Sequence, residues 1–575
     1  MQDQRNILIA IVLSMLVLLG WGAISDRYFP TAKEPSTKIV QGEEQVLPKP
    51  QADPTADHPR AMQSRAAALA ASPRVRIDTP ALRGSLRLAG ARIDDLVLKR
   101  HQETIARRQP IRLLSPAAAR GGAEAGWGWT GQGIATPGPD AVWTADGGLL
   151  APGRPVTLRW SNQTGQTFVI RLAVDENYLF TAEQRVENRG ANAVGVAPFS
   201  FVSRQNVSPD PDSWTIHTGP VGVFNGATEY DVDFSTVDEA GRGGVVRNTR
   251  GGWLGFTDLY WLTALVPPQD RAVEATFRKS AGGGYQADVQ APPAVVAPGL
   301  ASSTTSRLFA GAKEVRQLDR YEAAIPAPQF DNAIDWGWFA WFAKPIFHVL
   351  LWLFDLAGNF GVAIILLVVL VRVLLFPIAQ KQFRSMAQMR VIQPKLKALQ
   401  ERYKDDKPKL QQEMLKLYQT EKVNPAAGCL PLLIQIPIFY ALYKVLMLSV
   451  EMRHQPFVGW IRDLSAPDPL TPVNLFGLLP FTPPGFLAIG VLPILVGFTQ
   501  WLQFKLNPAP TDPVQAQVFG LMPWILIFVM APFAAGLQLY WLTNNILTIA
   551  QQKWLYRQYG VDEAEAKAKP QPAGS

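Results

Sequence analysis

Residues 360–379 read FGVAIILLVVLVRVLLFPIA, and this run constrains the fold more than any other feature of the chain. About 20 consecutive apolar residues suffice for a helix to cross the hydrocarbon core of a bilayer. The run carries one charged residue, Arg372. An arginine at the centre of such a helix costs about 3 kcal/mol on insertion scales, so its side chain normally faces a partner or water.

The other long apolar runs contain no Asp or Glu, so the sequence offers Arg372 no salt bridge within a membrane. Water remains as a partner, and we expect Arg372 to line a hydrated cavity. The alternative is that its long side chain snorkels along its own helix toward the interface, where Lys381 is the next charge. The two interpretations do not exclude each other.

The composition excludes several classes of site. Cys429 is the single cysteine of the 575 residues, so an intrachain disulfide and a multi-cysteine metal site are impossible. The five histidines are scattered, and there is no G-x-x-x-x-G-K phosphate loop. We therefore expect no cofactor and no metal. The net charge of +8 arises largely beside apolar runs, a pattern typical of cytoplasmic loops, and it does not predict direct nucleic-acid recognition.

The amino-terminal part predicts a membrane anchor and a linker. Residues 7–24 are uncharged, whereas the apolar core of a signal peptide usually has about 7 to 15 residues. We interpret 1–25 as a retained transmembrane anchor. The alternative is a cleaved signal peptide, because Ala23 and Ser25 offer a small-x-small site. Residues 26–73 are rich in Pro, Ala, Gln and charge, which predicts a flexible linker.

From 74 to 326 the sequence alternates apolar and polar residues in short runs broken by Gly, Pro and Asn. In VTLRW, for example, Val156, Leu158 and Trp160 share one face of a strand. This pattern favours an antiparallel β-sandwich. No cluster of carboxylates stands out in it, so we expect a structural or docking domain.

Two segments flank the central run. Residues 335–357 contain four tryptophans, which predicts an interfacial helix lying along the membrane surface. Residues 381–425 are strongly basic and show helical periodicity interrupted by a turn, which predicts a helical hairpin. The positive-inside rule places this hairpin in the cytoplasm.

Further apolar stretches bring the expected number of transmembrane helices to six. Besides the anchor and a helix over 358–380, we expect helices at 430–450, 486–504, 514–532 and 533–552. Both termini then lie in the cytoplasm, with 553–575 as a cytoplasmic tail. The weakly charged loop 451–485 and the β-sandwich lie on the other side.

Uncharged polar residues interrupt these apolar stretches. Gln538, Asn545 and Gln552 are spaced by seven residues and therefore share one helix face. Gln435 and Gln500 lie in two other stretches. One interpretation is that such amides join neighbouring helices, at about 0.6 kcal/mol each. The other is that, together with Arg372, they form a hydrated groove.

Five segments match a known family. They are NPAAGCLPLLIQIPIFYALY at 424–443, VRVLLFPIA around Arg372, MAQMRVIQPKLKAL at 386–399, and GPVGVFNG with WLGFTDLYWLTALVP in the β region. In these segments the chain resembles the YidC family of bacterial membrane-protein insertases, over nearly its whole length. A first anchor and a large outer domain are features of the Gram-negative form.

The resemblance implies a polytopic α-helical membrane protein of the bacterial inner membrane with a periplasmic β-sandwich domain. Five of the six transmembrane helices would form a core bundle around a hydrophilic groove. Nascent membrane proteins would enter this groove and pass into the lipid, alone or with the Sec translocase, and the ribosome would be a further partner. No bond is broken, so no catalytic residues are expected. The groove residues implied are Arg372, Gln435, Gln500, Gln538, Tyr540, Trp541, Asn544 and Asn545.

The chain departs from the family pattern at a few positions. Trp541 stands where members often have a second tyrosine, and Val368 replaces a threonine found in some members one turn before the arginine. The tail after Tyr559 carries several acidic residues, whereas basic tails aid ribosome contact in some members. The resemblance therefore leaves the ribosome contact of this tail open.

Two other classes of function are weighed against insertion. A secondary transporter usually needs an intramembrane carboxylate or a discontinuous helix, and the apolar runs contain no carboxylate. A membrane-anchored sugar-binding protein or envelope enzyme would depend on the β-sandwich. Deleting the β-sandwich separates these functions, because an insertase would keep much of its activity.

Overall fold

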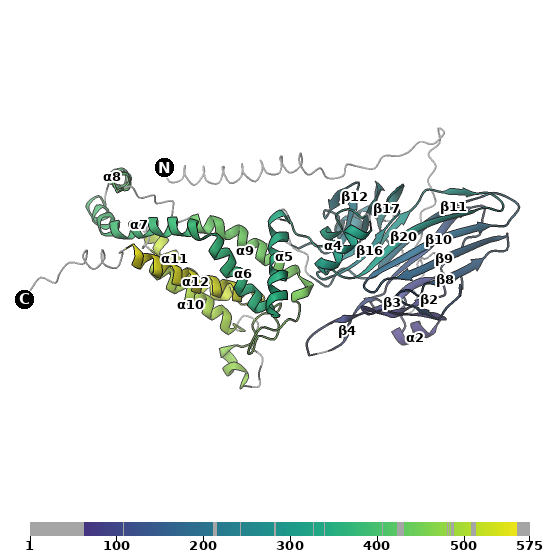
Figure 1. Cartoon of the computed structure of the whole chain (residues 1–575), viewed down its shortest axis with the longest axis horizontal. Coiled ribbons are helices and arrows are strands. Elements are labelled where there is room, and N and C mark those ends of the chain that lie inside the picture. Colours follow the sequence, from purple (N-terminus) through teal and green to yellow (C-terminus); the bar gives the residue numbers. More distant parts are fainter. Residues whose placement is uncertain are drawn as a thin grey trace, which may run out of the picture. The chain divides into compact units, whose positions relative to one another are not determined.

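A computed structural model describes residues 62–559, except 107, 211–215, 242, 281–282, 326, 338–339, 405, 422–429, 480, 482, 485–487 and 508–512. The chain forms two compact units that divide between Asp335 and Trp336. Figure 1 shows that the first is rich in strands and the second is helical. The predicted anchor 1–25, the linker up to 61, the tail beyond 559 and the side chain of Gln435 lie outside the described residues.

The first unit contains two large sheets. Among the described residues, the first sheet has eleven strands. Across it lie β14 (Val245–Arg250), β17 (Ala272–Lys279), β18 (Tyr285–Gln290), β11 (Val194–Arg204), β5 (Ala123–Gln132), β3 (Arg92–Gln102), β2 (Leu82–Arg87), β1 (Arg74–Asp78) and β7 (Leu149–Leu150). In addition, β19 (Ala294–Val296) pairs with β11 and β4 (Pro110–Leu114) pairs with β3. The pairing is antiparallel except between β1 and β7.

The second sheet has nine strands among the described residues, all paired antiparallel. They are β13 (Ala227–Glu229), β12 (Gly219–Phe224), β15 (Gly252–Thr257), β16 (Trp261–Val266), β20 (Ala301–Ala312), β10 (Leu179–Asn188), β9 (Gln166–Val174), β8 (Val156–Ser161) and β6 (Thr144–Ala145). The predicted alternation is visible in β8, where Val156 and Leu158 are buried and Arg159 is exposed.

The two sheets face each other and enclose an aromatic core. The ring of Trp129 on β5 lies 5.1 Å from that of Phe168 on β9, and Trp127 Nε1 donates a hydrogen bond to Ser306 Oγ on β20 at 3.1 Å. In the described part of this unit, three α-helices accompany the sheets, namely α2 (Arg65–Ala70), α3 (Phe234–Ala240) and α4 (Val315–Ala324). The unit extends beyond the predicted boundary at 326, because the buried ring of Phe330 lies 5.4 Å from that of Trp253.

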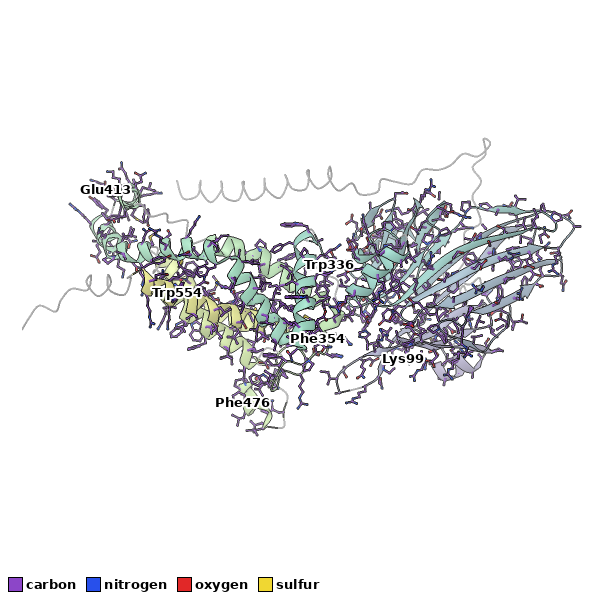
Figure 2. The ribbon with its side chains drawn as sticks, in the orientation of Figure 1. Lys99, Trp336, Phe354, Glu413, Phe476 and Trp554 are labelled. Atoms are coloured by element: carbon purple, nitrogen blue, oxygen red, sulfur yellow. The ribbon has the colours of Figure 1, made fainter. Side chains whose placement is uncertain are left out.

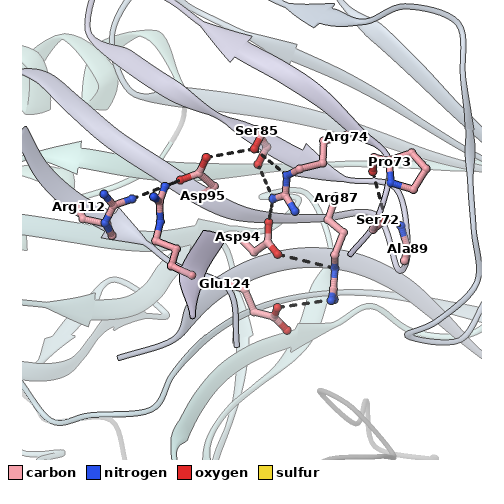
Figure 3. A network of polar contacts seen from close by, with 11 residues as sticks. Ser72, Pro73, Arg74, Ser85, Arg87, Ala89, Asp94, Asp95, Arg112 and Glu124 are labelled. Atoms are coloured by element: carbon pink, nitrogen blue, oxygen red, sulfur yellow. Dashed lines mark hydrogen bonds and ion pairs between the residues drawn. The ribbon is translucent and has the colours of Figure 1, made fainter. Parts of the chain in front are cut away.

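A network of buried charges joins the first strands, and Figure 3 shows it from close by. Asp94 on β3 is fully buried and pairs with Arg74 on β1, while Arg87 Nε lies 3.8 Å from its second oxygen. Arg87 Nη2 also lies 3.8 Å from Glu124 Oε2 on β5. Four strands are therefore linked through two carboxylates.

The second unit contains eight described helices with the bounds that follow. They are α5 (Ala340–Ala357), α6 (Phe360–Leu374), α7 (Phe376–Arg402), α8 (Lys407–Thr420), α9 (Leu430–Leu448), α10 (Val491–Leu506), α11 (Pro513–Met530) and α12 (Ala535–Gln558). By length and composition alone, α5 can cross a membrane, and the bent pair α6–α7 makes a second candidate if it counts as one broken span. The apolar parts of α9, α10 and α11 are shorter.

The helix that carries Arg372 ends earlier than the predicted 358–380. It stops at Leu374, and α7 leaves at an angle of 69°. Pro377 in the first turn of α7 explains the break, since proline has no N–H and its ring clashes with the carbonyl four residues before. Arg372 therefore lies in the last turn of α6, next to the bend.

The predicted surface segment 335–357 is also shorter as a helix. The helix α5 begins at Ala340 and ends at Ala357, and it is followed by Gly358, whose positive φ of 67° suits a glycine after a helix. Trp341 and Trp352 are exposed, whereas Trp336 is buried with its ring 5.7 Å from Phe347. Asn359 caps α6 by accepting a hydrogen bond from Val362 N–H at 3.1 Å.

The basic segment forms two helices that pack together. Ile392 and Leu396 of α7 are buried against Met414, Leu417 and Tyr418 of α8. This agrees with the helical periodicity of the sequence. The last helix, α12, runs to Gln558 and is longer than the predicted 533–552.

Candidate functional site: a polar cavity around Arg372

The helices of the second unit enclose a cavity of about 460 Å³. Its wall is formed by residues of α6, α7, α9, α10 and α12. Most of the wall is apolar, as in a cavity between membrane helices. The polar and aromatic side chains with hydrogen-bonding groups are Arg372, Gln382, Tyr440, Gln500, Gln503, Asn507, Tyr540, Trp541, Asn544, Asn545 and Thr548.

Arg372 is held by neutral groups of α12. Its Nε and Nη2 both donate to Asn544 Oδ1, at 3.2 and 2.7 Å, and its Nη2 also donates to the Asn544 carbonyl oxygen at 3.3 Å. Nη1 donates to Gln551 Oε1 at 3.3 Å, and Nη2 donates to Thr548 Oγ1. The helices α6 and α9 to α12 contain no Asp or Glu, so these bonds satisfy the guanidinium without cancelling its charge.

The Arg372 partners follow from the geometry of α12. Asn544, Thr548 and Gln551 are spaced by four and three residues, which places them on one face of a helix. The sequence analysis selected Asn544 but missed Thr548 and Gln551. The spacing of these three residues is the signal that could have found them. The expectation that only water remained as a partner for Arg372 was wrong, because amide and hydroxyl oxygens take that place.

The predicted seven-residue row has a different role. Asn545 Nδ2 donates to Thr499 Oγ1 on α10 at 3.1 Å. Gln552 is fully buried and donates to the Leu506 carbonyl at 3.1 Å and to Asn507 Oδ1 at 3.0 Å. These contacts join α12 to the end of α10, which is the helix-joining interpretation of such amides.

Gln538 lies in the first turn of α12 and is not among the residues of the cavity wall. Its Nε2 donates to the carbonyl oxygens of Met530 and Phe533, at 2.9 and 2.8 Å. It therefore fixes the connection between α11 and α12. The chain breaks between these helices at Ala531 to Ala534, around Pro532.

The remaining selected residues lie on the cavity wall. Trp541 Nε1 donates to Gln500 Oε1 at 3.2 Å, and its ring lies 5.0 Å from that of Phe439 on α9. Tyr540 is buried and also lines the cavity. Gln503 Oε1 is buried without a hydrogen-bond partner among the described residues, so it can accept a bond from water or a bound polar group.

The structure therefore brings together six of the eight selected residues, namely Arg372, Gln500, Tyr540, Trp541, Asn544 and Asn545. Gln538 lies elsewhere, and the side chain of Gln435 is outside the described residues. A role of these residues in substrate binding stays a prediction. In this arrangement, the Arg372 guanidinium lies in a largely apolar cavity, bonded to amide and hydroxyl oxygens and without a carboxylate partner among the described residues.

Two family models match the two units. The model described as "60Kd inner membrane protein" matches residues 352–563, and that of the "YidC periplasmic domain" matches residues 74–349. These features define a class of inner-membrane proteins. Its members have a helical membrane part, which here contains a polar cavity, and a β-rich periplasmic domain.

Relatives of nearly full length identify the family. A "Membrane protein insertase YidC" of Zymomonas mobilis subsp. mobilis is 49% identical, over 98% of this chain and 96% of that protein. One of Methylorubrum extorquens is 45% identical over 97% and 96%. A crystal structure of an active YidC insertase with its first transmembrane domain resolved covers 83% of this chain and 91% of its own, with 19% identity and a TM-score of 0.36. The chain belongs to the YidC family of membrane protein insertases.

This membership confirms the predicted function, which is insertion of membrane proteins and not enzymatic catalysis. The transporter and the envelope enzyme weighed in the sequence analysis are set aside. The location in the inner membrane and the periplasmic assignment of the β-rich domain follow from the same matches.

Proposed function

We propose that the cavity around Arg372 receives the polar segment of a nascent inner-membrane protein while its apolar segment passes along α9 and α11 into the lipid. Arg372 would attract an acidic segment into the cavity. The observation that carries the proposal is the set of hydrogen bonds between Arg372 and Asn544, Thr548 and Gln551, since all three partners are neutral.

The energetic reason is a shorter apolar path. A polar segment costs free energy wherever it leaves water, and a cavity with amide, hydroxyl and guanidinium groups replaces part of the lost hydration. Within a low-dielectric wall, one uncompensated cation also attracts a carboxylate more strongly than it would in water. Both effects favour substrates whose translocated tails are short and acidic.

The proposal includes a topology. The six spans would be the anchor and the helices α6, α9, α10, α11 and α12, with α5 along the membrane surface and both termini in the cytoplasm. The basic helices α7 and α8 would form the cytoplasmic hairpin. Gln382, Phe383 and Met386 of α7 line the cavity, which supports an opening toward this basic end.

The partners proposed are nascent membrane proteins, membrane lipids, the Sec translocase and the ribosome. The hairpin α7–α8 would meet the substrate first, because it is basic and residues near the start of α7 line the cavity. Because the tail after Tyr559 carries several acidic residues, we propose that ribosome contact falls mainly on this hairpin.

The decisive experiment is Asn544→Asp in the full-length protein, reconstituted in liposomes of phosphatidylethanolamine and phosphatidylglycerol. Aspartate has nearly the same shape as asparagine and keeps both acceptor contacts to Arg372, but it neutralises the guanidinium. Insertion is measured by protease protection of two substrates that differ only in an acidic or an uncharged translocated tail. If the free charge matters, Asn544→Asp lowers insertion of the acidic substrate about tenfold, which is ~1.4 kcal/mol.

The matched control is Asn544→Gln, which keeps a neutral amide. It is expected to retain most of the insertion of both substrates. A different role for Arg372, as a structural link between α6 and α12, makes the opposite prediction, because an ion pair would hold the helices at least as well. Unchanged or increased insertion by Asn544→Asp would therefore refute the proposal.

A further inference from the structure

An apolar segment between α9 and α10 has no role in the insertion mechanism above. We call it the apolar hook and define it by six side chains, which are Val473, Leu475, Phe476, Leu478, Leu479 and Phe481. Their exposed fractions range from 40% to 82%. From 469 to 504 the sequence has no charged residue. Figure 2 shows Phe476 at the tip of this segment, which extends away from the helices of its unit.

The base of the hook is closed and fixed. Val491 N–H donates to the Leu470 carbonyl at 2.9 Å, so the chain leaves and returns at one point. The buried carboxylate of Asp468 accepts hydrogen bonds from Leu492 N–H at 2.7 Å and from Trp460 Nε1 at 3.0 Å. The first of these caps the N-terminus of α10. The hook is thus attached directly to a helix of the bundle.

Several backbone N–H groups among the described residues of the hook donate to carbonyl oxygens of the same segment. Phe476 N–H donates to the Thr471 carbonyl at 3.0 Å, Leu479 N–H to the Asn474 carbonyl at 3.1 Å, and Phe481 N–H to the Leu479 carbonyl at 2.9 Å. Prolines at 472, 480, 483 and 484 have no N–H that would need a partner. Irregular backbone rarely enters lipid because unpaired amides are costly there, and this segment lowers that cost.

Two side chains are presented by a strained backbone. Leu475 and Phe476 have φ angles of 50° and 59°, in the left-handed region that large side chains rarely adopt. Such conformations are strained and persist mainly at functional sites. The side chains of Leu475 and Phe476 are both exposed, so packing inside the protein does not explain the strain of their backbone.

We propose that the apolar hook inserts into the lipid of the leaflet at this end of α9 and α10, and so anchors the bundle there. In the topology proposed above this is the periplasmic leaflet. A protein interface usually has a polar rim around an apolar centre. The hook carries no charged residue and is continuous in sequence with the apolar helix α10. Lipid is a binding surface that needs no polar or charged groups on the segment that enters it.

The test places a nitroxide spin label at Leu478→Cys, and separately at Phe481→Cys, in a Cys429→Ser background. The full-length protein is reconstituted in vesicles of phosphatidylethanolamine and phosphatidylglycerol. Collision rates are measured with oxygen, which concentrates in lipid, and with a neutral water-soluble nickel chelate. The matched control is Val295→Cys on β19 of the periplasmic domain, since Val295 is 79% exposed and Leu478 is 82% exposed.

The expected result is a ratio of oxygen to nickel collisions about tenfold higher at 478 and 481 than at 295. Adding Phe476→Asp should lower the ratio at 478 toward that of the control. A ratio at 478 equal to that at 295 overturns the proposal, because the hook then lies in water. Low collision rates with both reagents also overturn it, because the hook is then covered by protein. Neither outcome affects the role of Arg372, which is tested separately.

Discussion

Arg372 and Asn544 form a forked contact between α6 and α12, in which two nitrogens of the guanidinium share one amide oxygen at 2.7 and 3.2 Å. A carboxylate at this position would hold the side chain equally well and would cancel its charge. The amide fixes the orientation and leaves the charge in place. The orientation of the Arg372 side chain and its net charge can therefore be altered separately, by substituting Arg372 for the first and Asn544 for the second.

Arg372→Ala is expected to reduce insertion of a substrate with an acidic translocated tail about tenfold, whereas Arg372→Lys should stay within about twofold of the original protein. Lysine keeps the charge and loses the fork. The measurement is protease-protected substrate in reconstituted vesicles, with an uncharged tail as the control. Equal loss with both variants, at normal abundance and thermal stability, would show that the fork itself is required.

The adjacent residues Gln551 and Gln552 allow a comparison of two faces of one helix. Gln552→Leu removes the bonds to Leu506 and Asn507 and should lower the free energy of unfolding by about 1 kcal/mol, without changing the preference for acidic tails. Gln551→Leu removes a bond to Arg372 and should lower insertion of acidic tails about twofold. Thermal stability in detergent and the acidic-to-neutral insertion ratio are measured for both. Identical behaviour of the two variants would contradict the assignment of faces.

Asp94→Ala is expected to destabilise the periplasmic domain by about 3–5 kcal/mol, because it leaves Arg74 buried without its counter-ion. The control is Asp270→Ala, which removes an exposed partner of Arg271 and should leave the stability of the domain nearly unchanged. Susceptibility of the domain to protease over a range of urea concentrations measures the difference. Similar urea midpoints for the two variants would show that the network in Figure 3 contributes little.

Asp288 on β18 makes the stability of the periplasmic domain depend on pH. Burial raises its pKa to about 6, although Arg278 Nη2 donates to it at 2.5 Å. Since the folded state then binds the proton more tightly than the unfolded state, stability is greatest at acidic pH and falls as pH rises from about 4 through 6. Between pH 5 and pH 7 the loss should be about 1 kcal/mol.

Hydrogen exchange of peptides from β17 and β18, corrected for the intrinsic pH dependence, measures this loss. Asp288→Asn should abolish the difference between the two pH values, and peptides from β8 and β9 serve as the internal reference. A difference that survives in Asp288→Asn would assign the effect to another group.

The alternating strands and the apolar helices could be predicted because they depend on local periodicity. In β8, Val156 and Leu158 are buried as expected. The sheet order could not be predicted, since β11 lies between β5 and β18 through contacts that are distant in the sequence. The early end of α6 could have been predicted from Pro377, because proline disrupts the preceding helical turn. The prediction of one longer helix relied instead on the length of the apolar run.

Arg372 was evident from the sequence because a charge within an apolar run is costly. Its partners were harder to predict, because both faces of α12 are polar and periodicity alone does not fix how a helix is rotated against its neighbours. Asn545 and Gln552 contact α10, whereas Asn544, Thr548 and Gln551 contact Arg372. Only the packing of α12 between α6 and α10 separates the two sets.

The doubled residues Asn544–Asn545 and Gln551–Gln552 have a consequence for the evolution of this helix. Successive residues are turned by about 100° around a helix axis. A single-residue deletion just before Asn544 would therefore keep two amides facing the arginine, whereas a single-residue insertion there would keep two amides facing α10. After either slip in register, the two doublets keep one of the two sets of amide contacts of this helix in place.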